Sequence, residues 1–185
     1  YQYSYEDIQQ MLLDNTKSTN VKDTIHRFWD MFIIDALNGN FDRHGGNWGF
    51  IKRNDVYTMA PVYDNGSSMY PRLNSDSLLS EILSSEKEID RRIYSFPTSQ
   101  VKLNGKKSSY YEVIHSLQFD ACSHALERIV PRIHLEEINT LIDTIEDISQ
   151  IRKQFYKTMY QQRFEKILLC SYNKLKQEDR DEPYK

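Results

Sequence analysis

The chain has 185 residues, of which 39% are hydrophobic and 28% are charged, and its formal net charge is −3. This composition is typical of one globular domain with its own core, and the net charge argues against direct binding to nucleic acid or to a membrane surface. No apolar run approaches the roughly 20 residues that cross a bilayer. The two cysteines, Cys122 and Cys170, form no metal or redox motif, so we expect a cytoplasmic protein with reduced thiols.

Two helices are predicted in the first 40 residues. The first covers residues 4–15, with Ser4 as its N-cap. The second begins after Asn20 and ends at Asn38-Gly39-Asn40, a sequence typical of a helix C-terminus. Its apolar residues recur at helical spacing on one wide face, which predicts a largely buried helix. They are Val21, Ile25, Phe28, Trp29, Phe32, Ile33, Ala36 and Leu37.

A β-hairpin is predicted next. The segments 48–51 (WGFI) and 56–59 (VYTM) flank a turn at Asn54-Asp55, and Pro61 ends the second strand. A loop is expected from Asn65 to about Ser80, and a helix over residues 79–94. Residues 96–112 are expected to be mostly irregular, with a turn at Asn104-Gly105.

The rest of the chain predicts helices. Three are expected over residues 109–117, 119–130 and 135–148, and a long amphipathic helix over residues 151–176. Residues 179–185 read as a charged tail that is disordered. The predicted fold class is therefore mainly α (α+β), with one domain over residues 1–178 and one small hairpin inserted after the second helix.

A dense polar cluster lies where that helix meets the hairpin, in the stretch NGNFDRHGGNWGFI (residues 38–51). Asp42 and Asn47 are five positions apart, as are the Asp and Asn of the protein-kinase catalytic loop. There the Asp accepts the proton of the substrate hydroxyl and the Asn holds Mg²⁺, which prefers oxygen ligands. Gly45 and Gly46 either supply positive φ angles or allow a close approach.

A second metal ligand is predicted at Asp64, which follows the hairpin and precedes Asn65-Gly66. An Asp two residues before a Gly, directly after a short strand, is the layout of the kinase D-F-G element. Because a hairpin returns the chain to its starting point, Asn47 and Asp64 are expected to lie side by side.

These motifs resemble the C-terminal domain of HipA-like serine/threonine kinases, whose signature is N-x-D-R-H-x-x-N followed, after a hairpin, by a-P-l-Y-D. The matching residues are Asn40, Asp42, Arg43, His44 and Asn47, then Ala60, Pro61, Tyr63 and Asp64. The resemblance implies a kinase-like helical C-lobe with Asp42 as the catalytic base. It also implies ATP and Mg²⁺ as cofactors, with Asn47 and Asp64 as metal ligands. Arg43 and His44 would either order the loop or contact phosphate.

The function implied by the resemblance is transfer of the ATP γ-phosphate to a Ser or Thr hydroxyl of a protein. The resemblance also suggests an antitoxin-like partner. The chain contains no glycine-rich phosphate loop and no strand lysine of the kinase type. We therefore expect an N-lobe of roughly 100 or more residues to be supplied in cis or in trans, and the fragment alone to be inactive. The alternatives are a pseudokinase-type interaction module and, less favoured by the net charge of −3, a lipid-kinase-like phosphotransferase.

Each motif also has a structural interpretation. Asp42 and Asn47 would belong to an Asx-rich turn that caps the hairpin, and Asp64-Asn65-Gly66 would form a simple turn. His44 would be a buried, hydrogen-bonded histidine that only supports the loop. The serines downstream of Asp64 are either phosphorylation sites of an activation segment or ordinary loop residues: Ser67, Ser68, Ser75, Ser77 and Ser80. The other histidines lack metal-ligand spacing and are expected to be structural: His26, His115, His124 and His134.

Overall fold

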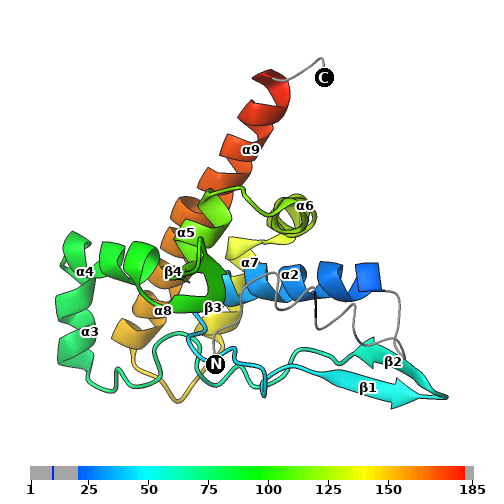
Figure 1. Ribbon diagram of the computed structural model, residues 1–185. Helices are drawn as coiled ribbons and strands as arrows, with labels where there is room; N and C mark the ends of the chain where they lie inside the picture. The colour runs from blue at the N-terminus through cyan, green and yellow to red at the C-terminus, as the bar shows by residue number, and fades with distance from the viewer. Residues whose placement is uncertain (1–9, 11–20, 182–185) are drawn as a thin grey trace.

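The computed structural model describes residue 10 and residues 21–181. The helix predicted over residues 4–15 and the cap predicted at Asn20 lie outside the described residues, apart from Gln10. Helix α2 (Val21–Asn38) crosses the middle of the molecule, and a long helical rod runs from α8 to the C-terminal α9 (Figure 1). The first hairpin projects away from this body below α2 (Figure 1).

Helix α2 is the buried centre of the fold, as predicted. Trp29, Ile33 and Ala36 are fully buried, and Phe28, Phe32 and Leu37 are at most 6% exposed. Val21 and Ile25 are partly buried against the same core. The helix ends where Gly39 adopts a φ of +61°, a conformation that glycine adopts without steric cost.

The predicted hairpin is confirmed. Strands β1 (Phe50–Arg53) and β2 (Val56–Met59) pair antiparallel, with Phe50 opposite Met59. Asn54 and Asp55 have φ angles of 49° and 61°, which a two-residue turn of the primed type requires. The amide of Ala60 donates to the carbonyl of Gly49 over 2.8 Å, so the two ends of the hairpin lie side by side.

The helix predicted over residues 79–94 is three shorter elements. They are α3 (Asp76–Leu83), α4 (Glu86–Asp90) and the π-helical η1 (Arg91–Ser95). Ser75 and Ser85 act as N-caps, accepting hydrogen bonds from the amides of Leu78 and Glu88. Serine side chains compete with the backbone in this way, which interrupts a helix that apolar spacing alone would continue.

The prediction that residues 96–112 are mostly irregular is wrong. Strands β3 (Thr98–Leu103) and β4 (Lys106–Ser109) form a second antiparallel hairpin, closed by Asn104-Gly105 with φ angles of 50° and 72°. The turn was predicted correctly, but the strands are rich in Lys and Ser, and their apolar alternation is limited to Val101 and Leu103. Val101, at 1% exposed, and the partly buried Leu103 anchor β3 to the core.

The remaining helices follow the prediction, with shifted ends. They are α5 (Tyr110–His115), α6 (Asp120–Ile129), the 3₁₀ turn η2 (Val130–Arg132), α7 (Leu135–Asp143), α8 (Gln150–Arg163), the π-helical η3 (Phe164–Leu169) and α9 (Cys170–Asp181). The last three form the predicted long helix, which continues to Asp181 and thus past the expected domain end at residue 178. The prediction of a mainly α (α+β) fold is confirmed.

Two apolar clusters hold these elements together. The larger surrounds α2 and includes Trp29, Leu126 and Ile167; the smaller joins α3 to α8 through Leu79 and Phe155. Within the described residues, no helix is long and apolar enough to cross a membrane. Both clusters border the loops that carry the polar motifs.

Candidate active site

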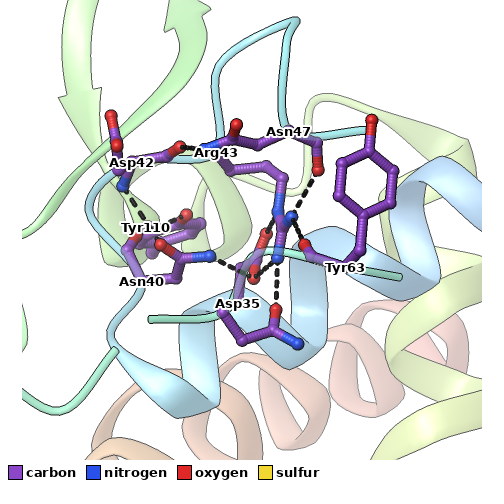
Figure 2. A network of polar contacts seen from close by, with 8 residues as sticks. Asp35, Asn40, Asp42, Arg43, Asn47, Tyr63 and Tyr110 are labelled. Atoms are coloured by element: carbon purple, nitrogen blue, oxygen red, sulfur yellow. Dashed lines mark hydrogen bonds and ion pairs between the residues drawn. The ribbon is translucent and has the colours of Figure 1, made fainter. Parts of the chain in front are cut away.

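The predicted catalytic loop begins at a buried asparagine. Asn40 is 0% exposed, and its side-chain amide donates to Asp35 Oδ1 over 3.0 Å. Its Oδ1 accepts the amide of Asp42 over 3.1 Å, and its carbonyl accepts the hydroxyl of Tyr110 over 2.9 Å. Burial raises the pKa of Tyr110 well above the ordinary value and Asp35 adds to this, so the hydroxyl stays a donor. The backbone that presents Asp42 is therefore fixed on both sides (Figure 2).

Arg43 connects this loop to the far end of the hairpin. Its Nε and Nη2 donate to the two carboxylate oxygens of Asp35 over 2.7 and 3.0 Å. Nη1 donates to the carbonyls of Asn47 and Tyr63 over 2.6 and 2.5 Å, and Nη2 also donates to Asn65 Oδ1 over 2.5 Å. All five guanidinium donors are thus used by protein acceptors, as Figure 2 shows around the central guanidinium.

The ion pair beneath this network is buried. Arg43 is 6% exposed and Asp35 is 1% exposed. Burial by itself lowers the pKa of Arg43, but the hydrogen bond and charge of Asp35 outweigh it and raise the pKa. Of the two roles left open for Arg43, ordering the loop is the one that its contacts serve, because no donor is left for a phosphate.

The chain after the hairpin runs beside the catalytic loop. The carbonyl of Ser67 accepts the amide of Phe41 over 3.4 Å, and the amide of Met69 donates to the carbonyl of Asn38 over 2.9 Å. Asp64 lies between Tyr63 and Asn65, both of which accept hydrogen bonds from Arg43. Its φ is 54°, a value that is uncommon outside glycine and is tolerated by Asp. The hairpin therefore returns Asp64 to the loop that carries Asn47.

The side-chain oxygens predicted to bind the metal take no part in this hydrogen-bond network. Asn47 is 7% exposed; its Nδ2 donates to the carbonyl of Asp42 over 2.8 Å, and its own carbonyl accepts from Arg43. In the part of the chain that the structure describes, Asn47 Oδ1 and the carboxylate of Asp64 accept no hydrogen bond. The side chain of Asp42 is 48% exposed, and its Oδ1 lies 4.0 Å from His44 Nε2.

His44 is half-exposed rather than buried, although it does form a hydrogen bond within the loop, as the structural alternative expected. Its side chain is 44% exposed, and its Nδ1 accepts the amide of Gly46 over 3.0 Å. A Cβ on residue 46 would lie 2.9 Å from His44 Cε1. A side chain at residue 46 would therefore require the half-exposed His44 ring to shift, while the positive φ angles recorded for glycines are those of Gly39 and Gly105.

These residues fit a magnesium site of the kind completed by a nucleotide. Magnesium is usually held by one or two protein carboxylates together with waters and substrate phosphates. Asn47 Oδ1 and the Asp64 carboxylate are uncommitted oxygen atoms on backbones that one guanidinium ties together. Among the described residues, no group of three or more His, Cys, Asp or Glu side chains is placed to hold a metal ion.

Two supports of the site were missed from sequence. Asp35 was read only as part of an amphipathic helix, although an acidic residue within the apolar run FIIDAL was a visible signal. Arg163 of α8 is 0% exposed and donates to the carbonyl of Ala36 over 2.6 Å, next to Gly39. Nothing near Arg163 in the sequence indicates this contact, because the two residues meet only in the folded chain.

Comparison with known proteins shows the family to which the chain belongs. The sequence model of the protein family described as HipA-like C-terminal domain matches residues 1–118. The serine/threonine-protein kinase CtkA of Helicobacter pylori is 37% identical over 192 residues, covering 90% of this chain and 59% of CtkA.

A crystal structure of the H. pylori proinflammatory kinase CtkA superposes with a TM-score of 0.87 at 37% identity, covering 94% of this chain and 64% of that one. The chain thus spans about three-fifths of the length of the curated relative that it matches. The chain belongs to the family of HipA-like C-terminal domains, a group of kinase type.

Proposed function

We propose that this chain is the catalytic lobe of a protein kinase that transfers the ATP γ-phosphate to a Ser or Thr hydroxyl. The observation that carries the proposal is the five-bond coordination of Arg43, which ties the backbones of Asn47 and Tyr63 to Asp35. This network joins the backbone segments that carry Asp42, Asn47 and Asp64, which supports a shared site for the three side chains. The similarity to CtkA, a named serine/threonine-protein kinase, supports the same reaction class.

Each residue has a distinct role in the proposed reaction. The half-exposed carboxylate of Asp42 accepts the proton of the acceptor hydroxyl as the hydroxyl oxygen attacks the γ-phosphorus and the bond from that phosphorus to ADP breaks. Asn47 Oδ1 and the Asp64 carboxylate would hold Mg²⁺, with Arg43 keeping their two backbone segments in register. Mg²⁺ held there would supply neutralisation of the charge on the phosphate oxygens. His44 lies beside Asp42 and is placed to orient the carboxylate or to contact phosphate.

The expected N-lobe, supplied in cis or in trans, would cover the adenine of ATP. The protein substrate and the antitoxin-like partner stay predictions. The proposal for this chain concerns only the lobe that holds the base and the metal ligands.

The test is a [γ-³²P]ATP transfer assay on the longest natural form of the protein. Asp42→Asn and Asp64→Asn should each lower the transfer rate by about 100-fold or more, because a positioned base or metal ligand contributes at least that much. Asn is chosen at residue 64 because it tolerates the positive φ. Asp55→Asn at the exposed tip of the hairpin is the matched control and should retain the wild-type rate.

Wild-type transfer by Asp42→Asn and Asp64→Asn would overturn the assigned roles. A folded wild-type protein that neither binds Mg²⁺ and ATP nor transfers phosphate would favour the pseudokinase alternative. Phosphate on a lipid rather than on Ser or Thr would favour the lipid-kinase alternative.

A further inference from the structure

A cavity of about 370 Å³ opens next to the catalytic loop. Its walls combine three arginines with three aromatic side chains: Arg72, Arg91, Arg92, Phe41, Tyr70 and Phe96. A cavity of this size is within the range of sites that hold a small ligand or one side chain of a partner. It uses none of the residues assigned above to the base or to the metal.

The cavity carries an excess of positive charge. Glu88 is the carboxylate that faces these arginines, at 2.7 Å from Arg92 and 3.8 Å from Arg91. Arg72 is exposed, stands 5.9 Å from the centre of the Phe41 ring, and has no carboxylate partner among the described residues. Three guanidinium groups thus face one carboxylate, which favours an anionic occupant.

Arg92 has donors that the protein does not use. It is 7% exposed, and its Nη1 donates to the carbonyl and the carboxylate of Glu88 over 2.8 and 2.7 Å. Its Nε has no partner but lies beneath the surface, out of reach of a ligand. No described residue accepts from its Nη2, and Arg92 lines the cavity. Because buried donors are almost always paired in folded proteins, Nη2 is the donor available to an anion in the cavity.

The cavity is also rigid and close to the proposed base. The Tyr70 hydroxyl lies 2.9 Å from the carbonyl of Arg92 and 3.1 Å from that of Phe96. Phe41 and Phe96 stack with ring centroids 6.1 Å apart. Phe41 immediately precedes Asp42, so their Cα atoms are about 3.8 Å apart. A peptide with its hydroxyl at Asp42 would reach the cavity with a side chain roughly two to four residues away.

We propose that this arginine-aromatic cavity binds a phosphorylated or acidic side chain of the protein substrate, close to the acceptor hydroxyl. Arginine donors match the oxygens of a phosphate or carboxylate, and the stacked rings of Phe41 and Phe96 take the apolar neighbour of that residue. The choice of substrate as occupant rests on the proposed function. The anion site itself does not depend on it.

The experiment measures binding without ATP, so that it is independent of catalysis. Three fluorescein-labelled peptides, Gly-Phe-Gly-X-Gly-Ser with X as phosphoserine, glutamate or serine, are titrated into the 185-residue chain and followed by fluorescence anisotropy. Phosphoserine should bind tightest, glutamate next, and serine at least about tenfold more weakly than phosphoserine. Inorganic phosphate should compete with the phosphoserine peptide.

The two double variants use exposed residues, so that folding is retained, and the single variant changes the buried Arg92 only to another cation. Arg72→Ala/Arg91→Ala should weaken phosphoserine binding by about tenfold or more. Arg53→Ala/Arg132→Ala removes the same charge from exposed positions outside the cavity and should bind as the wild type does. Arg92→Lys keeps the positive charge but removes the planar guanidinium with its paired donors. It should also lose the preference for phosphoserine.

Equal binding of the three peptides, no binding at all, or an equal loss in both double variants would overturn the proposal. The last result would mean that net charge alone attracts the peptide. If phosphoserine binding behaves as expected while Asp42→Asn retains phosphoryl transfer, the cavity stands as an anion site and the proposed catalytic roles fail instead.

Discussion

The site region and the helical body are stabilised in different ways. Around the catalytic loop, Asp35, Asn40 and Arg43 are all at most 6% exposed and are joined by hydrogen bonds with fixed directions. In the helical body, Trp29, Leu126 and Ile167 are buried in apolar contact. Apolar contacts adapt to small changes in volume, whereas a buried polar group that loses its partner has no substitute.

This difference indicates where the chain tolerates amino-acid substitutions. The helical body has to be apolar and of about the right volume, and many sequences meet that condition. The site region needs particular donors and acceptors at particular positions. Conservative substitutions should therefore be mild in the body and severe in the site region.

The largest effect is expected for Arg43→Met. It leaves the Asp35 carboxylate buried without its partner, which lowers the free energy of unfolding by about 3–5 kcal/mol. Urea unfolding followed by circular dichroism measures the change. Arg53→Met, on the exposed hairpin, is the control and should be close to neutral. Adding Asp35→Asn to Arg43→Met should recover part of the loss; a further full-sized loss would mean that the two residues act independently.

A smaller loss is expected for Asn40→Ala. The amide of Asp42 loses its acceptor and Asp35 loses a donor, which costs about 1–3 kcal/mol for the buried groups left unpaired. The same urea titration detects it, with the exposed Asn74→Ala as the matched change. If the two alanine variants are equally stable, the loop does not depend on this side chain.

Ile33→Val tests the apolar side of the comparison. Ile33 is 0% exposed, and removal of one methyl group from a core costs about 0.5–1.5 kcal/mol. Thermal unfolding should show a cooperative transition at a slightly lower temperature. A loss as large as that of Arg43→Met would contradict the idea that the body is the more tolerant region.

The smallest effect concerns pH. The hydrogen bond from Arg92 lowers the pKa of Glu88 from its ordinary value of 4.5. A lowered folded-state pKa stabilises the protein above the unfolded value, and this contribution is lost as the pH falls through the folded one. Glu88→Gln should thus be less stable than the wild type at pH 7, with the difference shrinking below pH 4.5. A difference that does not change with pH would exclude this ion pair as its source.

Much of the fold was predictable because local signals agreed with the tertiary structure. Helix α2 shows a wide apolar face, and the first hairpin combines β-branched and aromatic residues with an Asn-Asp turn. The second hairpin was missed because β3 and β4 are polar, and their pairing depends on the elements around them. The break between α3 and α4 was missed because the capping of Ser85 competes with helical spacing.

The sequence by itself determined the family resemblance and the candidate site residues: Asp42, Asn47 and Asp64 stand at motif spacing on either side of a hairpin that local signals specify. Tertiary structure alone decided how these residues are held and what lies beside them. Arg43 turns out to join Asp35, Asn47 and Tyr63, and Arg72, Arg91 and Arg92 gather around Phe41. The physical reason is that hydrogen bonds and charge clusters between distant segments produce no periodic pattern in the sequence. Helices, turns and motifs, by contrast, depend on residues that are neighbours in the chain.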